Sequence, residues 1–313
     1  MSDDRFPPVE PSDTYADLPF GRRCWERFKY GCYRALAWWI RTWPRPFAYW
    51  LGSRICDVSY FLNGRARHAV EANLRVVYKS RGVELSERLL RNVTRKTFQN
   101  FGKYVADFIC IGALTPPLIR KYISIRGGEY YRAIRDEPGG VILLTAHVGN
   151  WELGGALVTA LGRTLNVVVR PISFRTVERI YDNFRQRRGM RPIPLQHAAA
   201  GILRALRRKD AVAFVGDRDF IHDGVETRFF GRPTPMPRGP AWFAWKTKTP
   251  IYLGFVRREP GDSYTVRFLP PIRPEDAASE QEIRQRIADA IEEAIWSDPT
   301  QWFVFDEFWK REG

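Results

Sequence analysis

From residue 140 onward, short apolar segments alternate with stretches of helical periodicity. Apolar runs separated by amphipathic helices are typical of a mostly parallel sheet that helices cover on both faces. We therefore predict an α/β fold with a mostly parallel central sheet. The predicted strands are 140–147, 165–170, 191–195, 210–216, 225–230, 251–256 and 264–269, and the predicted helices are 150–161, 176–188, 197–208, 237–247 and 280–296.

The first third of the chain has a different character. Residues 22–79 read as helices that break at Trp43-Pro44-Arg45-Pro46 and at Asn63-Gly64. A further helix is predicted from Ser86 to about residue 111. We thus expect a disordered N-terminus over 1–20, a helical portion over 21–115 and an α/β portion over 116–313 that forms one integrated domain.

The helical portion interleaves arginine with aromatic residues. The whole chain has 50 Lys and Arg against 35 Asp and Glu, a net charge of +15, and it contains 11 Trp. Such an excess favours a polyanionic partner, which can be nucleic acid, a phosphorylated substrate or an anionic membrane. Rings mixed with arginine are typical of helices at a bilayer surface. We predict membrane-associating helices here; the alternative is that they pack on the domain with solvated arginines.

Several other classes of protein are disfavoured. No uncharged run reaches the roughly 18 to 20 apolar residues of a spanning helix, and the polar start of the sequence has no signal-peptide core. The sequence has none of the motifs of serine hydrolases, P-loop proteins or dinucleotide enzymes. We expect reduced thiols in a cytoplasmic chain, because no metal-ligand spacing relates the four cysteines, which are Cys24, Cys32, Cys56 and Cys110.

His147 ends the predicted strand 140–147, and Glu152 follows in the first turn of a helix that Asn150 would cap. Across this strand-to-helix turn, the carboxylate can fold back onto the imidazole. It would then orient the ring, so that the other ring nitrogen can take a proton from a hydroxyl. Backbone N–H groups at the helix start would stabilise an oxyanion. The alternative is a structural histidine.

Two further strand ends carry charged residues, on the edge of the sheet where chemistry gathers in such folds. Arg170 leaves the strand 165–170 and could face a phosphate or a developing oxyanion, or pair with a carboxylate. Asp217 and Asp219 follow the strand 210–216. They could chelate a divalent metal, as in many nucleotide-sugar glycosyltransferases, or support a basic site.

His147-Val-Gly-Asn-Trp-Glu152 resembles the H-x-x-x-x-D/E block of the lysophospholipid acyltransferase superfamily, and in particular its lipid A biosynthesis lauroyl/myristoyl acyltransferases. The similarity spans roughly residues 30 to 310. Further blocks match in the same order, namely Arg170-Pro171, Gly216-Asp217-Arg218-Asp219, Phe229-Phe230-Gly231-Arg232-Pro233 with Pro237-Arg238-Gly239-Pro240, and Asp298-Pro299-Thr300-Gln301-Trp302.

The resemblance implies an enzyme that moves a fatty acyl chain from a thioester, on acyl carrier protein or coenzyme A, to a hydroxyl of a membrane glycolipid or lysolipid. It implies no metal or other cofactor, no nucleic acid, and a peripheral or monotopic position on the cytoplasmic face of the inner or plasma membrane. His147 would be the general base and Glu152 its charge partner. The other expected site residues are Arg170, Arg232 and Arg238 for the oxyanion or a phosphate, with Asn150, Asp217 and Asp219 in support.

Two departures from the lipid A enzymes bear on the acceptor. Those enzymes carry Asp-Gln-Asp where this chain has Asp217-Arg218-Asp219, and an aromatic-His-Arg-Arg tail that residues 303–309 lack. Both features are more similar to phosphatidylinositol mannoside acyltransferases. The acceptor is thus expected to be lipid A precursor-like or phosphatidylinositol mannoside-like, with a lysophospholipid as the alternative. From other classes, a metal-dependent glycosyltransferase using Asp217 and Asp219, or a non-catalytic basic protein that binds membrane or nucleic acid, stays open.

Overall fold

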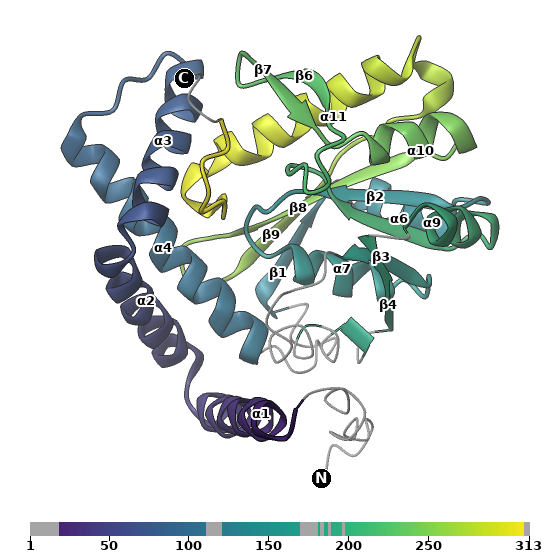
Figure 1. The fold of residues 1–313 in the computed structure, drawn as a ribbon. Coiled ribbons are helices and arrows are strands. Elements are labelled where there is room, and N and C mark those ends of the chain that lie inside the picture. Colours follow the sequence, from purple (N-terminus) through teal and green to yellow (C-terminus); the bar gives the residue numbers. More distant parts are fainter. Residues whose placement is uncertain are drawn as a thin grey trace.

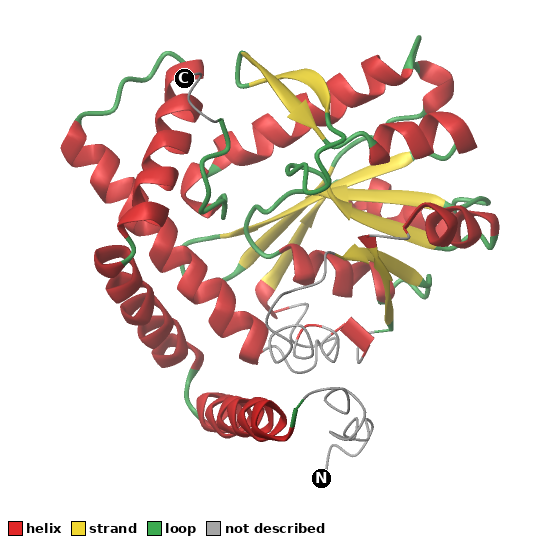
Figure 2. Ribbon diagram, in the orientation of Figure 1, coloured by secondary structure: helices red, strands yellow, loops and turns green. Residues whose placement is uncertain are grey.

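A computed structural model describes residues 19–110, 121–169, 181, 185–186, 189–195 and 198–309. At the centre of these residues is a sheet with the strand order β1-β9-β8-β2-β5-β3-β4 (Figures 1 and 2). Neighbouring strands pair in parallel except β8 and β9, which are antiparallel, so the expected mostly parallel sheet is confirmed. The strands are β1 (Ile123–Arg126), β2 (Val141–Thr145), β3 (Leu165–Val169), β4 (Met190–Pro194), β5 (Ala211–Val215), β8 (Ile251–Arg258) and β9 (Tyr264–Phe268).

Helices cover both faces of the sheet, because its central strands are apolar on both sides. In β2, Val141 and Leu143 pack beneath α6 (Gly128–Asp136) and α7 (Trp151–Thr159). Ile142 and Leu144 point the opposite way, toward α9 (Ala198–Arg207), α10 (Gly239–Thr247) and α11 (Glu280–Ser297). Successive strand residues face opposite sides, so this one strand contributes to two separate hydrophobic cores.

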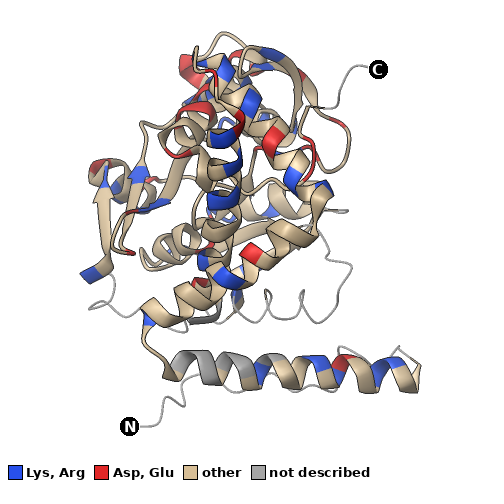
Figure 3. Cartoon of the chain, turned by 90° about the vertical axis from the view of Figure 1, so that its left-hand side faces the viewer, with Lys and Arg blue, Asp and Glu red and all other residues tan. Residues whose placement is uncertain are grey.

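Four helices precede the sheet: α1 (Phe20–Thr42), α2 (Arg45–Leu62), α3 (Gly64–Ser80) and α4 (Glu87–Cys110). The breaks fall at Pro44 and Asn63, as predicted, and the Asn63 side chain caps α3 by accepting from the backbone N–H of Ala66. Helices α2 and α4 pack so closely at Gly52 and Gly102 that a Cβ on either glycine would collide with the backbone of the other helix. Helix α1 lies at one end of the molecule, where it contacts α4 (Figure 3).

None of the helices in the described ranges combines the length and the apolar character needed to cross a bilayer. The predicted N-terminal disorder (1–20) falls on residues outside these ranges up to residue 18, and the predicted helix 176–188 also lies mostly outside them.

A small antiparallel hairpin, β6 (Val225–Phe229) and β7 (Arg232–Met236), packs against α11. Its two-residue turn, Phe230-Gly231, has φ values of 50° and 74°, as a type I′ turn requires. Strand β7 was not predicted, because Pro233 and Pro235 argue against a strand. The hairpin tolerates them because it has only two strands. Strand β1 and helix α6 were also not predicted.

Candidate active site

The register of two neighbouring strands brings His147 and Asp217 together. Thr145 at the end of β2 pairs with Val215 at the end of β5, and each charged residue follows two positions later. Nδ1 of His147 lies 2.7 Å from Oδ1 of Asp217, and the backbone N–H of His147 donates to the same oxygen at 3.1 Å. The carboxylate therefore fixes both the ring and the chain that carries it.

Asp217 is completely buried, yet it is held in its ionised form. Burial by itself raises the pKa of this carboxyl, but the charge of the His147 imidazole and the hydrogen bonds from His147 and Trp302 outweigh it, so that the pKa lies below its ordinary value. The indole Nε1 of Trp302 donates to Oδ2 at 2.9 Å. An ionised Asp217 accepts from Nδ1–H of His147, which leaves Nε2 as the basic nitrogen.

The loop after His147 is bound by backbone hydrogen bonds on two sides. Gly149 has a φ of 59° and lies so close to Val256 of β8 that a Cβ would collide with its carbonyl oxygen, which makes glycine necessary here. The N–H of Gly149 donates to the carbonyl of Gln301 at 2.9 Å, and the N–H of Phe303 donates to the carbonyl of His147 at 2.8 Å. The chain after α11 thus clamps the loop.

Glu152 does not take the position expected for it. The Asn150 side chain caps α7, as predicted, by accepting from the N–H of Leu153 at 3.1 Å. Glu152 lies in the first turn of this helix and pairs with Arg185, whose Nη2 is 2.6 Å from Oε1 of Glu152. Asp217, and not Glu152, is therefore the carboxylate on Nδ1 of His147. The neighbouring strand end is closer to the imidazole than the helix that follows it.

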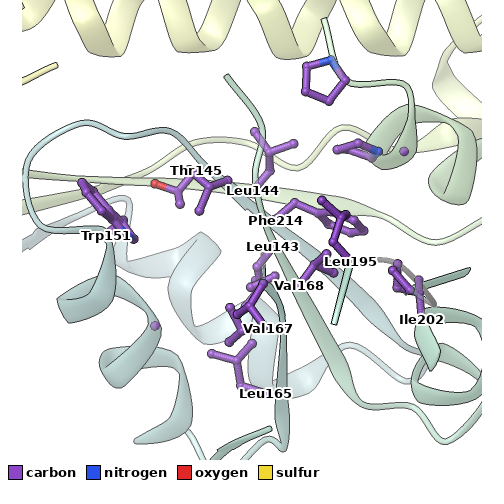
Figure 4. Close-up of a pocket in the computed structure, with 18 of the residues that line it drawn as sticks. Leu143, Leu144, Thr145, Trp151, Leu165, Val167, Val168, Leu195, Ile202 and Phe214 are labelled. Carbon is purple, nitrogen blue, oxygen red and sulfur yellow. The ribbon is translucent and has the colours of Figure 1, made fainter. Parts of the chain in front are cut away.

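A cavity of about 1220 Å³ is lined by His147 and Glu152 and by apolar residues of β2, β3 and β5. Figure 4 shows the lining side chains along the strands, from Thr145 down to Leu165. On the α7 face, Ala213 in the middle of β5 and Gly155 of α7 are only partly buried, although both lie inside the fold. Their exposure is to the cavity, one part of which lies between α7 and the sheet, while Leu144, Phe214 and Phe243 line another part on the α10 side.

The sequence matches the profile of the bacterial lipid A biosynthesis acyltransferases over residues 25–311. The chain belongs to this family. The resemblance seen in the ordered motifs is confirmed, and the protein is an acyltransferase. The pairing of a histidine with a buried carboxylate beside an apolar cavity is thus part of an acyltransferase fold.

Relatives of this acyltransferase include two phosphatidylinositol mannoside acyltransferases. The one from Mycobacterium tuberculosis (strain CDC 1551 / Oshkosh) is 27% identical over 222 residues, which cover 68% of this chain and 69% of the relative. The one from Mycolicibacterium smegmatis is 22% identical over 289 residues, which cover 83% and 93%. Among solved structures, the 1-acyl-sn-glycerophosphate acyltransferase PlsC from Thermotoga maritima aligns with a TM-score of 0.39 and 11% identity, covering 83% of this chain and 100% of that one.

The other predicted site residues of the acyltransferase lie in different places. Asp219 lines the cavity and accepts from the N–H of Gly224 at 2.9 Å. Arg238 precedes α10 and also lines the cavity. Arg232 is exposed at the start of β7 and is not among the lining residues. Arg170 lies outside the described residues.

The geometry of Asp217 and Asp219 does not favour a shared cation. The first carboxylate accepts from His147 and Trp302, and one oxygen of the second accepts from Gly224. Within the described part of the chain, no three or more His, Cys, Asp or Glu side chains come together as metal ligands would. That the enzyme needs no cofactor stays a prediction.

Two residues of this site, Trp302 and Arg185, were not predicted from the sequence. Trp302 was noted only as part of a matching block, and its distance from residue 217 along the chain gave no sign of their contact. Arg185 lies on a predicted helix without any motif of its own. The N–H of a buried tryptophan usually has a hydrogen-bond acceptor, and this general rule is the only signal in the sequence that could have indicated a polar partner for Trp302.

Proposed function

We propose that this acyltransferase moves a fatty acyl chain from an acyl thioester, carried on acyl carrier protein or coenzyme A, to a hydroxyl group of a membrane glycolipid. The observation that carries the proposal is the position of the His147–Asp217 pair in the wall of a largely apolar cavity. A base beside such a cavity suits a reaction in which a polar hydroxyl meets the carbonyl end of a hydrocarbon chain.

In the proposed reaction, Nε2 of His147 takes the proton from the acceptor hydroxyl while the oxygen attacks the thioester carbonyl carbon. Asp217 stabilises the imidazolium that forms, through its bond to Nδ1. When the tetrahedral intermediate collapses, the C–S bond breaks and the imidazolium returns the proton to the leaving thiolate. The products are an ester and a free thiol, and the histidine is neutral again.

The negative charge on the tetrahedral oxygen needs stabilisation. Helix α7 begins four residues after His147, and the partial positive charge of its N-terminal end favours an oxyanion. Arg238, which lines the same cavity, supplies a second positive charge for the oxyanion or for a phosphate of the substrate. Arg170 keeps the same proposed role on sequence grounds. Glu152 would act through Arg185, by holding that guanidinium at the cavity.

The donor acyl chain would lie between α7 and the sheet. Leu143, Val167 and Ala213 form the sheet side of this part of the cavity, and Gly154 and Gly155 form the helix side. Two consecutive glycines leave space next to the strands that larger side chains would fill. The floor of the cavity is closed by Leu165 and Met190, which are 0% and 2% exposed.

For the acceptor, the relatives suggest a phosphatidylinositol mannoside-like glycolipid, and the family suggests a lipid A precursor-like one. Arg218, the residue that departs from the lipid A enzymes, lines the cavity and pairs with Asp306 at 2.8 Å. Both glycolipids combine sugar hydroxyls with phosphate. Mass spectrometry of lipids from cells with and without the protein distinguishes them, because the missing acyl mass appears on one lipid class only.

We also propose that α1 and α2 bind the cytoplasmic face of the membrane in which the acceptor lies. Large apolar side chains point into solvent along both helices, among them Trp25, Phe28 and Trp38 of α1 and Trp50 and Phe61 of α2. Lys and Arg occupy positions between them along the same helices (Figure 3). Exposed rings beside arginines suit the headgroup region of an anionic bilayer, and a water-exposed surface does not explain them.

The decisive experiment replaces the proposed base. His147→Ala should keep the fold, because the imidazole is partly exposed, and should reduce acyl transfer from a long-chain acyl thioester to a membrane glycolipid by about 10² to 10⁴-fold. His68→Ala is the matched control, since this histidine is exposed on α3. Circular dichroism verifies folding. Full activity of the His147→Ala protein would show that the mechanism is wrong.

A further inference from the structure

Asp107 is a buried carboxylate that the reaction above does not use. It lies near the end of α4 and is 0% exposed. Its Oδ1 accepts from the hydroxyl of Tyr49 at 2.6 Å, and its Oδ2 accepts from Arg258 and Tyr264. The side-chain amide of Asn150 also donates to Oδ2, at 3.4 Å. A buried ionised carboxylate is stable only when such donors surround it.

The donors around Asp107 come from separate parts of the fold. Tyr49 belongs to α2, and its hydroxyl accepts from Nη2 of Arg45 at 2.6 Å. Arg258 ends β8 and Tyr264 begins β9. Asn150 precedes α7 in the loop that carries His147. An unbroken set of contacts therefore connects the helical portion with the loop of the active site.

The donors Arg258 and Tyr49 keep their protons at neutral pH. Burial by itself lowers the pKa of the Arg258 guanidinium, but Asp107 and the tyrosines Tyr264 and Tyr49 raise it above its ordinary value. Burial and the charge of Asp107 also raise the pKa of Tyr49 to about 12. Every donor thus keeps its proton, and the guanidinium lies 4.5 Å and 4.9 Å from the ring centres of Tyr49 and Tyr264.

The side-chain amide of Asn150 makes hydrogen bonds to both α7 and Asp107. Its Oδ1 accepts from the N–H of Leu153 and caps the helix, while its Nδ2 donates to the carboxylate. Its own backbone N–H donates to the carbonyl of Val256 at 3.1 Å. Because the Asp107 carboxylate serves here only as a hydrogen-bond acceptor, the Nδ2 end of the Asn150 amide must face it. If the amide were rotated by 180°, Nδ2 would face the N–H of Leu153, and the cap would lose its acceptor.

We infer that Asp107 is a positioning residue of the acyl-transfer site: it holds Asn150, and thereby the loop 147–150 and the first turn of α7, in the arrangement that the reaction needs. The inference rests on the proposed function. It predicts that the loss of this contact lowers turnover and leaves substrate binding nearly unchanged, because Asp107 does not line the cavity.

The test is a double-mutant cycle in the full-length enzyme with Asp107→Asn, Asn150→Ser and both together. Serine keeps the cap and loses the amide donor. With a palmitoyl thioester and phosphatidylinositol mannoside in vesicles, we expect each single change to lower kcat about tenfold with KM within about twofold, and the pair to fall no further. Effects that multiply, or a loss confined to KM, would overturn the inference.

A second measurement covers the case in which Asp107→Asn does not fold or the enzyme does not transfer acyl groups from this donor. Tyr49→Phe removes the hydroxyl that donates to Asp107 and accepts from Arg45, and it leaves the Asp107–Arg258 pair intact. We expect faster amide hydrogen exchange over residues 148–153 in this variant. Tyr131→Phe, which removes a hydrogen bond to Leu157 on the far side of α7, is the matched control. Unchanged exchange in Tyr49→Phe would contradict the positioning of the loop, whereas an inactive wild-type enzyme contradicts only the proposed function.

Discussion

At the scale of single residues, the carboxylate that bonds to the imidazole of His147 is Asp217 and not Glu152. The notable position in the sequence was Glu152, five residues after His147 in the family's motif. The partner of the imidazole instead comes from a strand 70 residues away along the chain. Only the order of strands in the sheet decides which carboxylate is adjacent, and apolar strand patterns do not give that order. His147, the Asn150 cap and the strand ends were predictable; the pairing of His147 with Asp217 was not.

Asp217→Asn should preserve the shape of the site and lose its chemistry. The amide cannot stabilise an imidazolium as a carboxylate does, and it favours the wrong ring tautomer. We expect acyl transfer to fall by about 10² to 10⁴-fold with KM for the thioester little changed. Steady-state kinetics measure this, and Asp219→Asn serves as the comparison. Equal losses in the two variants would mean that Asp217 has no special role.

The stability of the wild-type protein should depend on Asp217 in a defined direction. Its pKa is lower in the folded state, so the ionised form favours folding at pH values above the ordinary carboxyl pKa of about 3.9, and this contribution is lost as the pH falls through the lowered pKa. Thermal unfolding between pH 7 and pH 3 should therefore show the melting temperatures of wild type and Asp217→Asn converging at the acid end.

Trp302→Phe removes the indole donor from Oδ2 of Asp217 and keeps an aromatic ring in place. A hydrogen bond to a charged group contributes about 1.5–3 kcal/mol, so we expect kcat to fall roughly 10- to 100-fold. Trp309→Phe is the control, because the indole of Trp309 donates to Thr234 and not to the site. A similar loss of kcat in the two variants would assign the effect to packing.

At the scale of elements, the predictable features were those with a clear apolar pattern. The strands β2, β3 and β5 are mainly apolar, and the breaks before α2 and α3 occur at proline and at Asn-Gly. Strand β1 has four residues of mixed polarity, and β7 contains two prolines. Their strand conformation depends on pairing with β9 and β6, which is tertiary information.

Helix α7 should determine which acyl chains the enzyme accepts. A Cβ at Gly155 would lie 3.1 Å from Cε of Met190, so the helix side of the cavity has little room to spare there. We expect Gly155→Leu to shift the preference toward shorter thioester donors. A series of acyl lengths measures this shift. Ala160→Leu, on the exposed end of the same helix, should leave the preference unchanged; an unchanged preference in Gly155→Leu would place the chain elsewhere.

At the scale of the whole molecule, α1 carries exposed aromatic side chains and lies at one end of the enzyme, where it contacts α4. We expect Trp25→Ser with Phe28→Ser and Trp38→Ser to weaken binding to phosphatidylglycerol vesicles without a loss of helical structure. Vesicle co-sedimentation at two salt concentrations measures the effect. The control is Leu89→Ser with Ile221→Ser, which removes exposed apolar groups outside α1 and α2. Equal binding by the triple variant and the wild type would contradict the proposed surface.

The clamp formed by the chain after α11 has a consequence for how the enzyme is made. Asp217 accepts a hydrogen bond from the indole N–H of Trp302, and the carbonyl of His147 accepts one from the N–H of Phe303. The side chain of Asn73 in α3 donates to the carbonyls of Val304 and Asp306. A nascent chain that has not yet reached residue 302 lacks all of these bonds. The full set of contacts that fixes the loop of His147 therefore forms only after residues 302–306 have been synthesised, which is later than the synthesis of His147 and Asp217 themselves.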